Sequence, residues 1–590
     1  MKINDIKDIL RFVWAKSRTA ASLALLCPLL NAISIGVGTI LSAMIINGLI
    51  SGVDSKTLIL TVLVGLCLLF VLKILGSYLQ NKKAVQVNIL EKIFNMEIGR
   101  TTMKMDYEAL ESPAVGKLRA RMNNDRQWGL GFGSVIRQAE GVVDGIFGVI
   151  TGIVLLIPFL TTAGHVSTSL FFFTAILLSF ASAAVSVRFV GDRNLKMLDE
   201  YTASSAFFGH FIWQPLNVSS VKDINLFHAY ALIREHVDQR YDQKDRWTTR
   251  YARLHMTGGL VSGLSIGMIQ FGANMLILLR AASESIPAGS VMLYIAAFLG
   301  VSVSFSRLCA TAASLSIAAK RQKSTLEYLK SDEVAEGDTH PVSQIKKHEI
   351  TFENVSYRYP GCNNFALRNV SFSITGHTRI AVVGLNGSGK STLIKLLCRL
   401  IEPTEGRILL DGTDIKYYEI GSYRNLFGVL FQDFKLLPFT LDQNVSASTR
   451  PDRERVSSVL ALSGFHDRLF ELPLGIDTPL YSVFHEKGID MSGGESQKIA
   501  IARALYRDAS FIILDEPTTA LDPISECKLY KEFHAFSKNK AVIFVSHRLS
   551  FGYLVDEILV FCDGLLIERG SHESLIAKSN SAYAELWKEG

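Results

Sequence analysis

Residues 384–391 form a loop whose composition suits phosphate binding. They read Gly-Leu-Asn-Gly-Ser-Gly-Lys-Ser and follow the aliphatic run Ile380–Val383, which predicts a buried strand. Glycines at this spacing let backbone N–H groups close around phosphate oxygens, Lys390 adds a positive charge, and the Ser391 hydroxyl can bind Mg²⁺. The residues that follow have a helical pattern, so a helix N-terminus would also face the anion. The candidate binding residues are Gly384, Asn386, Gly387, Ser388, Gly389, Lys390, Ser391 and Thr392.

A second apolar run, further along the chain, ends in two adjacent carboxylates. Phe511–Leu514 predicts a buried strand, and Asp515 and Glu516 follow it directly. Asp515 suits a water molecule bound to Mg²⁺, as in other phosphate-loop enzymes. Glu516 is placed to act as the base for an attacking water. Together with the phosphate loop, this strand predicts that the chain binds a nucleoside triphosphate with Mg²⁺.

Length and composition predict at least two domains of different character. The chain has 590 residues, too many for one core, and 48% of them are hydrophobic, with the apolar excess before residue 320. The net charge of +6 is small for this length and gives no indication of nucleic-acid binding. The seven cysteines include no C-x-x-C pair, which predicts reduced thiols rather than a zinc site or disulfides.

The first half contains six apolar stretches, each long enough to cross about 30 Å of hydrocarbon as a helix. The long loops 81–140 and 188–253 are basic, whereas the three short loops are nearly uncharged. By the positive-inside rule, the long loops, both termini and the nucleotide-binding half lie in the cytoplasm of a multi-pass cell-membrane protein. The stretches are about Ser22–Ile46, Thr57–Leu79, Gly141–Leu160, Ser167–Val187, Thr257–Leu279 and Ala288–Leu308.

Three further features of this half lead to expectations. The apolar residues of 6–14 recur at helical spacing, which favours an amphipathic helix on the inner leaflet over one packed on the protein. Lys73 and Asp144 both lie about 24 Å below the outer ends of their spans, so they are predicted to form a charge pair if they face each other. Within the long loops, Tyr107–Pro113 and Gln214–Asp223 are candidate contacts with the nucleotide-binding domain.

The segment Met491–Gln497 identifies a family. It reads Met-Ser-Gly-Gly-Glu-Ser-Gln and resembles the signature L-S-G-G-Q-x-Q, in its expected place before the acidic strand. With the phosphate loop and the apolar half, the whole chain resembles an ABC transporter half-molecule of the exporter type. The resemblance implies an all-α six-span transmembrane domain at residues 1–330, a linker at 331–347 and an α/β phosphate-loop ATPase domain at 348–590.

The resemblance also implies roles for residues outside the phosphate loop. Tyr359 resembles the aromatic residue that stacks on adenine, and Gln432 resembles the glutamine that contacts Mg²⁺ and senses the membrane domain. Ala520–Asp522 resembles the D-loop, and His547 resembles the switch histidine at the γ-phosphate. The implied cofactors are ATP and Mg²⁺. The implied catalytic residues are Glu516, His547, Lys390 and Gln432, and the implied Mg²⁺ ligands are Ser391, Gln432 and Asp515.

In this family the signature of one subunit closes over the ATP of the other. Ser492, Gly493 and Gly494 at a helix start would present N–H donors to the γ-phosphate. The chain has one such domain, so it is predicted to dimerise, with a second copy favoured and a different half-transporter also open. Glu495 departs from the usual glutamine and would bring a negative charge near the polyphosphate, which predicts slower turnover at most.

The function implied is ATP-driven export of an amphipathic or hydrophobic solute, such as a drug, lipid or peptide. The membrane lipid and this solute are the expected partners besides the second subunit. Two alternatives stay open: uptake of a metal chelate on the same fold, and an ATP-gated channel or regulatory subunit. Six membrane spans exclude a soluble ATPase that acts on nucleic acid.

Overall fold

The computed structural model describes residues 3–127, 131–161, 174–178, 180–185, 189–190, 193, 197, 218–284, 286–330, 340–342, 348–517, 540–546, 552–578 and 580–589. They form two compact units. The first consists of Met1–Met105 and Ala114–Glu333, and the second of Asp106–Pro113 and Val334–Gly590. The second unit therefore takes in a short piece of the first long loop, which the predicted boundaries had left with the membrane domain.

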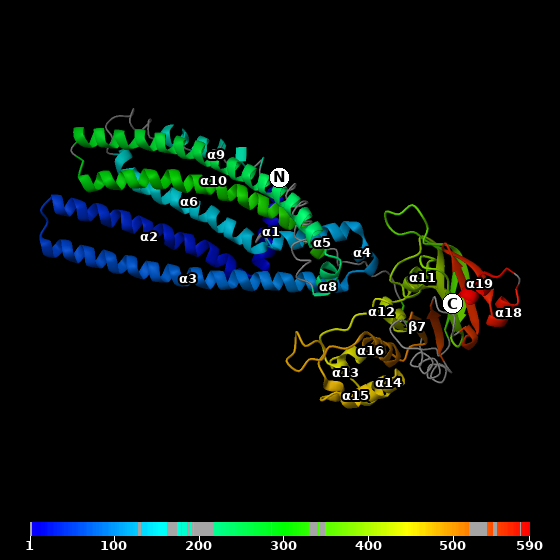
Figure 1. Ribbon diagram of the computed structural model, residues 1–590. Helices are drawn as coiled ribbons and strands as arrows, with labels where there is room; N and C mark the ends of the chain where they lie inside the picture. Colours follow the sequence, from blue (N-terminus) through cyan, green and yellow to red (C-terminus); the bar gives the residue numbers. More distant parts are fainter. Residues whose placement is uncertain are drawn as a thin grey trace. The chain divides into compact units, whose positions relative to one another are not determined.

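Long helices make up the first unit (Figure 1). Among the described residues, five helices are long and apolar enough to cross a membrane, and they contain five of the six predicted stretches. The remaining stretch, Ser167–Val187, lies partly outside the described residues, and its described part is helical at 174–178 and 180–185. The helices are α1 (Ile3–Lys16), α2 (Arg18–Ile50), α3 (Ser55–Lys104), α5 (Pro113–Gln127), α6 (Phe132–Thr161), α8 (Val218–Leu226), α9 (Tyr230–Glu284) and α10 (Ala288–Lys330).

Helix α1 packs part of its apolar face on the protein, and contact of the rest with the inner leaflet stays a prediction. Ile9 and Val13 are buried in an apolar cluster with residues of α2, α3, α6 and α10. Two residues of the apolar face stay exposed, Leu10 at 36% and Trp14 at 46%. The sequence of an amphipathic helix does not tell whether its apolar face contacts lipid or protein, since either environment removes that face from water.

Helices α6 and α10 approach each other closely because α6 carries a stripe of glycines. A Cβ atom on Gly145 would come within 2.9 Å of the Leu308 Cα, and one on Gly148 within 2.3 Å of the Ser304 Oγ. Small residues at this spacing let helix backbones meet in an apolar environment. The contact fixes the register between Asp144 on α6 and Arg307 on α10. The stripe is Gly141, Gly145, Gly148 and Gly152.

The second unit contains two sheets. A six-stranded sheet has the order β10-β9-β3-β8-β7-β6, in which β9, β3, β8, β7 and β6 run parallel and β10 is antiparallel. A four-stranded antiparallel sheet has the order β2-β1-β4-β5. The strands are β1 (Glu349–Tyr357), β2 (Leu367–Thr375), β3 (Arg379–Val383), β4 (Glu405–Leu410), β5 (Thr413–Asp414), β6 (Phe427–Leu430), β7 (Phe511–Asp515), β8 (Ala541–Val545), β9 (Glu557–Cys562) and β10 (Leu565–Gly570).

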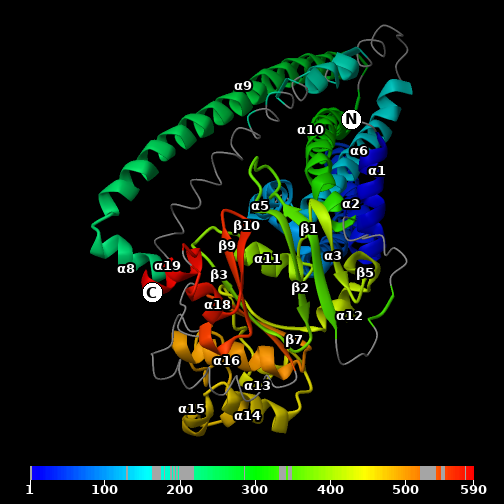
Figure 2. The ribbon, with the colours of Figure 1, turned by 90° about the vertical axis from the view of Figure 1, so that its right-hand side faces the viewer.

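Helices of this unit cover the two faces of the six-stranded sheet separately. Alternate strand residues point to opposite faces, so Ala381 and Leu514 belong to one apolar cluster, and Val382 and Ile513 to another. Helix α16 packs in the first cluster and α11 in the second, and Figure 2 shows them apart with strands such as β7 between them. The helices are α11 (Lys390–Leu397), α12 (Ile420–Arg424), α13 (Leu441–Ser446), α14 (Arg453–Leu462), α15 (His466–Glu471), α16 (Gly493–Tyr506), α18 (His572–Ile576) and α19 (Ala582–Glu589).

The one-turn helix α4 (Tyr107–Glu111) belongs to this second unit through polar contacts. The Lys395 ammonium lies 2.9 Å from a carboxylate oxygen of Glu111 and 5.1 Å from the centre of the Tyr107 ring. A Glu108 carboxylate oxygen accepts a hydrogen bond from the Glu402 backbone N–H at 3.2 Å. The second candidate contact, Gln214–Asp223, lies partly outside the described residues.

Candidate active site

The phosphate loop joins β3 to α11 in a conformation that requires glycine. The φ angles of Gly387 and Gly389 are 83° and 104°, in the left-handed region that other residues avoid. A Cβ atom on Gly389 would also come within 2.7 Å of the Ala366 carbonyl oxygen. Gly389 is the N-cap of α11 and supplies no side-chain cap, so the first N–H groups of this helix are open to an anion.

The residues of this loop fit a nucleotide phosphate. Among the described residues, the buried Ser388 hydroxyl has no hydrogen-bond partner, which is the mark of a polar group that a ligand satisfies. The Lys390 ammonium donates to the carbonyl oxygens of Gly384 at 2.8 Å and Leu385 at 2.9 Å. Burial lowers the pKa of Lys390, against the opposing effect of the nearby carboxylates. Lys390 thus lies inside the loop, ready to exchange its carbonyl partners for phosphate oxygens.

The two carboxylates predicted from the sequence lie at the carboxyl end of β7, beside Gln432, which follows the neighbouring strand β6. The Gln432 amide donates a hydrogen bond of 2.7 Å to the Glu516 carboxylate. Asp515 is only 6% exposed, and burial together with the charge of Glu516 raises its pKa to about 6. The two neighbouring carboxylates, Asp515 and Glu516, suit a site for a divalent cation. Asp515, Gln432 and Ser391 would hold the cation. Mg²⁺, when bound, would supply positive charge beside the phosphates.

The Glu516 backbone is held in a strained conformation, and sequence reasoning had not assigned one of the residues that hold it. Glu516 has a φ of 48°, which is unfavourable for a non-glycine residue. Its N–H donates to the Val545 carbonyl oxygen at 2.8 Å, and its own carbonyl oxygen accepts from the Gln497 amide at 3.1 Å. Gln497 is buried and comes from the signature helix α16. Its place at the end of the quoted motif was the only sequence signal for this role.

Tyr359 lies beside the start of α11, as an adenine-stacking residue should. Its hydroxyl lies 3.2 Å from the Thr392 hydroxyl, and its ring is edge-on to Tyr357 with the centres 5.0 Å apart. The Lys395 ammonium lies 5.7 Å from the ring centre. The half-buried ring is therefore fixed next to the phosphate loop, and its stacking on adenine stays a prediction.

The signature starts α16 with a capping box. The Ser492 hydroxyl accepts from the Glu495 N–H at 3.3 Å, and the Glu495 carboxylate accepts from the Ser492 N–H at 2.7 Å. Arg468, which sequence reasoning had not singled out, lies 2.7 Å from the other carboxylate oxygen. Burial opposes ionisation of Glu495, but these partners outweigh it and lower its pKa. The negative charge expected near the polyphosphate is thus paired with a guanidinium, while Gly493 at the helix start is exposed.

His547 and the D-loop Ala520–Asp522 lie outside the described residues. The strand that leads to His547 is described, and it places Ser546 at the end of β8, next to β3 and β7. The Ser546 N–H donates to the Val382 carbonyl oxygen at 3.3 Å, so the predicted switch residue follows a strand at the centre of the sheet.

In the membrane unit, the predicted pair of Lys73 with Asp144 is wrong. Asp144 instead lies 2.6 Å from the Arg307 guanidinium and accepts a hydrogen bond of 3.1 Å from the Asn31 amide. The depth of each residue follows from its position along the span, but the face of each helix does not. The glycine contact between α6 and α10 brings Arg307 opposite Asp144. Lys73 forms no ion pair with a described residue.

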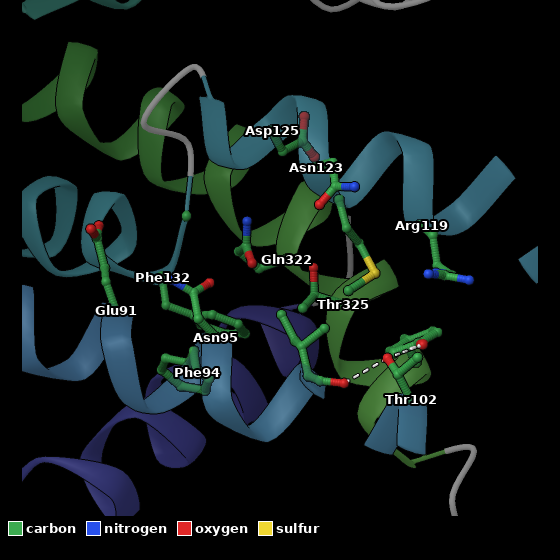
Figure 3. A pocket seen from close by; sticks show the side chains of 14 residues that line it. Glu91, Phe94, Asn95, Thr102, Arg119, Asn123, Asp125, Phe132, Gln322 and Thr325 are labelled. Carbon is green, nitrogen blue, oxygen red and sulfur yellow. Dashed lines mark hydrogen bonds between the residues drawn. The ribbon is translucent and has the colours of Figure 1, made fainter. Parts of the chain in front are cut away.

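A pocket of about 190 Å³ lies between α3, α5, the start of α6 and α10 (Figure 3). Asp125 in its lining forms a buried ion pair with Arg321, and the Tyr328 hydroxyl lies 2.6 Å from the Thr102 hydroxyl. The figure shows Glu91 and Arg119 on opposite sides of the pocket. Charges of both signs thus line it, and its paired groups fasten the ends of the three helices together.

The fold and the site define a phosphate-loop ATPase unit joined to a unit of membrane-spanning helices. Residues 367–519 match the family described as ABC transporter. The chain is 40% identical over 243 residues to the ATP-dependent lipid A-core flippase of Sodalis glossinidius, 41% of each chain. It is 31% identical over 376 residues to the Subtilin transport ATP-binding protein SpaT of Bacillus subtilis, 62% of this chain and 59% of that protein. It therefore spans less than two thirds of these curated relatives.

A solved structure extends the likeness in fold to the membrane unit. The structure described as a bacterial Atm1-family ABC exporter with ATP bound has a TM-score of 0.74 and 21% identity, covering 97% of this chain and 98% of that one. Residues 367–519 thus match the ABC transporter family, and the chain as a whole shares the fold of this exporter structure.

Proposed function

We propose that two copies of this chain form an ATP-driven exporter, each copy completing the ATP site of the other. The observation that carries the proposal is the placement of α11 and α16 on opposite faces of one sheet. A rigid sheet separates the phosphate loop from the exposed start of the signature helix. The signature glycines would therefore reach a γ-phosphate most readily on a second ATPase unit.

Within each site, Glu516 would take a proton from the attacking water, and Gln432 would orient that carboxylate through the hydrogen bond described above. Lys390, Ser388 and the open N–H groups of α11 would bind the phosphates. Closure of the two ATPase units would be favoured by ATP, because ATP binds the closed dimer better than the open one. Helix α4, which is fixed to the ATPase unit through Lys395, would carry that closure into the first long loop.

The transported solute is proposed to be an amphipathic lipid or peptide, moved outward across a cell membrane with both termini in the cytoplasm. The names of the relatives support these classes, since they describe a lipid A-core flippase and subtilin transport. An ATP-gated channel is less well supported. It would depend on Lys73, Asp144 and Arg307 as pore charges, and two of these neutralise each other.

The decisive experiment combines mass measurement of the solubilised complex with trapping of ATP in Glu516→Gln. The amide cannot accept the proton, so the variant should bind one ATP per chain and turn it over at least about a hundredfold more slowly. Glu573→Gln, an exposed glutamate on α18, is the matched control and should keep normal turnover. A dimer of one chain type with ATP in both sites supports the proposal, and a monomer with full ATP turnover contradicts it.

A further inference from the structure

The α2–α3 helix pair carries a polar groove on one of its faces. This groove, of about 740 Å³, is lined by α2, α3 and the first turns of α10, and its polar lining includes Asn31, Ser42, Lys73, Ser77 and Gln80. A different face of the same two helices forms a smaller cleft of about 420 Å³, in which the only hydroxyl is that of Thr61. Lipid chains suit the second face, whereas the polar groups of the first suit water or a polar solute.

The groove has one formal charge, and it is positive. Lys73 lies near the middle of the groove segment of α3, on the same face as Leu69, Gly76 and Gln80. Asn31, on the facing side of α2, directs its amide to Asp144, whose other oxygen is taken by Arg307. The carboxylate that Asn31 contacts is therefore already paired with a guanidinium. No described residue forms an ion pair with Lys73, so its ammonium is available to a ligand.

The polar pocket of Figure 3 is a useful contrast within the same unit. That pocket has Glu91, Arg119 and the ion-paired Asp125 in its lining, so it presents both signs of charge. The groove presents a single sign, together with the apolar side chains of Leu30, Leu72 and Met292. A ligand that matches this lining has an anionic head and an apolar tail.

We propose that the α2–α3 groove binds the anionic headgroup of an amphiphile, with Lys73 as the residue that selects for negative charge. The inference rests on the proposed export function and gives its substrate class: an amphiphile with a phosphate or carboxylate head, and not a cationic peptide. The Lys73 ammonium donates charge-assisted hydrogen bonds to the head, and the leucine and methionine side chains contact the start of the tail.

The test compares the binding of three amphiphiles that share a dodecyl tail and differ in the charge of the headgroup. Dodecyl phosphate, dodecyltrimethylammonium and dodecyl maltoside are titrated, without nucleotide, into the full-length protein in phosphatidylcholine nanodiscs. Wild type should bind dodecyl phosphate at least about tenfold more tightly than the other two, because a charge-assisted hydrogen bond in a low-dielectric site has that strength. Lys73→Ala should abolish this preference, Lys73→Arg should keep it, and Lys73→Glu should reverse it toward dodecyltrimethylammonium.

The matched control is Lys82→Ala, which removes an exposed lysine of the same helix outside the groove lining and should leave the preference intact. Equal loss of affinity for all three heads in Lys73→Ala, or no loss at all, would overturn the proposal. Inorganic phosphate that binds as tightly as dodecyl phosphate would overturn the amphiphile assignment. Binding is measured without ATP, so a failure of the proposed ATPase mechanism, seen as full turnover in Glu516→Gln, would leave this result readable on its own.

Discussion

Replacing Asp515 by asparagine should stabilise the nucleotide-free protein even though it damages the Mg²⁺ site. The carboxylate is 6% exposed and lies beside Glu516, and these two causes raise its pKa to about 6. The usual value for an aspartate is about 3.9, and each pKa unit corresponds to about 1.4 kcal/mol. Keeping Asp515 ionised therefore lowers the free energy of unfolding by up to about 3 kcal/mol at neutral pH. Asparagine carries no charge, so the variant should regain this free energy.

The sign of the pH dependence follows from the raised pKa. A group whose pKa is higher in the folded protein contributes stability at low pH, and this contribution is lost as the pH rises through about 6. The stability gap between Asp515→Asn and wild type should therefore be about half formed at pH 5 and complete above pH 7. For an ATPase domain of this size, the full gap corresponds to an increase in melting temperature of several degrees, at most about 10 °C.

The assay is thermal unfolding in detergent between pH 5 and pH 8, with EDTA and no nucleotide. Asp508→Asn is the control of opposite sign, because a hydrogen bond from Lys540 lowers the pKa of Asp508 and its loss should not stabilise. Added Mg²⁺ and ATP should stabilise wild type and leave Asp515→Asn nearly unchanged. A variant that melts at or below the wild-type temperature across the whole pH range would refute the reasoning.

Three further outcomes are expected from the nucleotide site. Lys390→Ala should abolish ATP turnover but leave membrane insertion intact; turnover near that of wild type in the purified variant would disprove the phosphate-loop assignment. Gln497→Met should lower kcat by about tenfold or more with little change in KM, because it removes the hydrogen bond that holds the strained Glu516 backbone and does not touch the nucleotide. The control is Ser496→Ala, and an equal decrease in kcat there would show that α16 as a whole had been disturbed. Glu495→Gln should keep the capping box and alter the steady-state ATPase rate by less than about threefold. Arg468→Ala leaves the Glu495 carboxylate without its guanidinium and should lower the rate more. If Glu495→Gln is the slower of the two variants, the ion pair is unimportant.

Local sequence determined the ATP site to a large extent. The phosphate loop, the acidic strand end and the signature each consist of neighbouring residues whose types are dictated by local backbone geometry. The conformations of Gly387 and Gly389 could be predicted from the sequence, because only glycine adopts such positive φ angles without a steric penalty. The nearness of Asp515 and Gln432 could be predicted because Asp515 ends one buried parallel strand and Gln432 follows another, and the carboxyl ends of such strands meet at one edge of a sheet. The lengths of the apolar stretches likewise predicted the membrane-spanning helices, because a helix needs a minimum number of apolar residues to cross a bilayer.

Tertiary structure decided which side chains meet. The sequence placed Lys73 and Asp144 at similar depth, but only the packing of α6 on α10 through glycines shows that Asp144 faces Arg307 and that Lys73 is left to the groove. Likewise, Arg468 and Gln497 acquire their roles from helices and strands far apart in the chain, and no local pattern marks such contacts. The depth of a residue and its local conformation follow from its neighbours in sequence, whereas the partner of a charge depends on how helices turn about their axes when they pack.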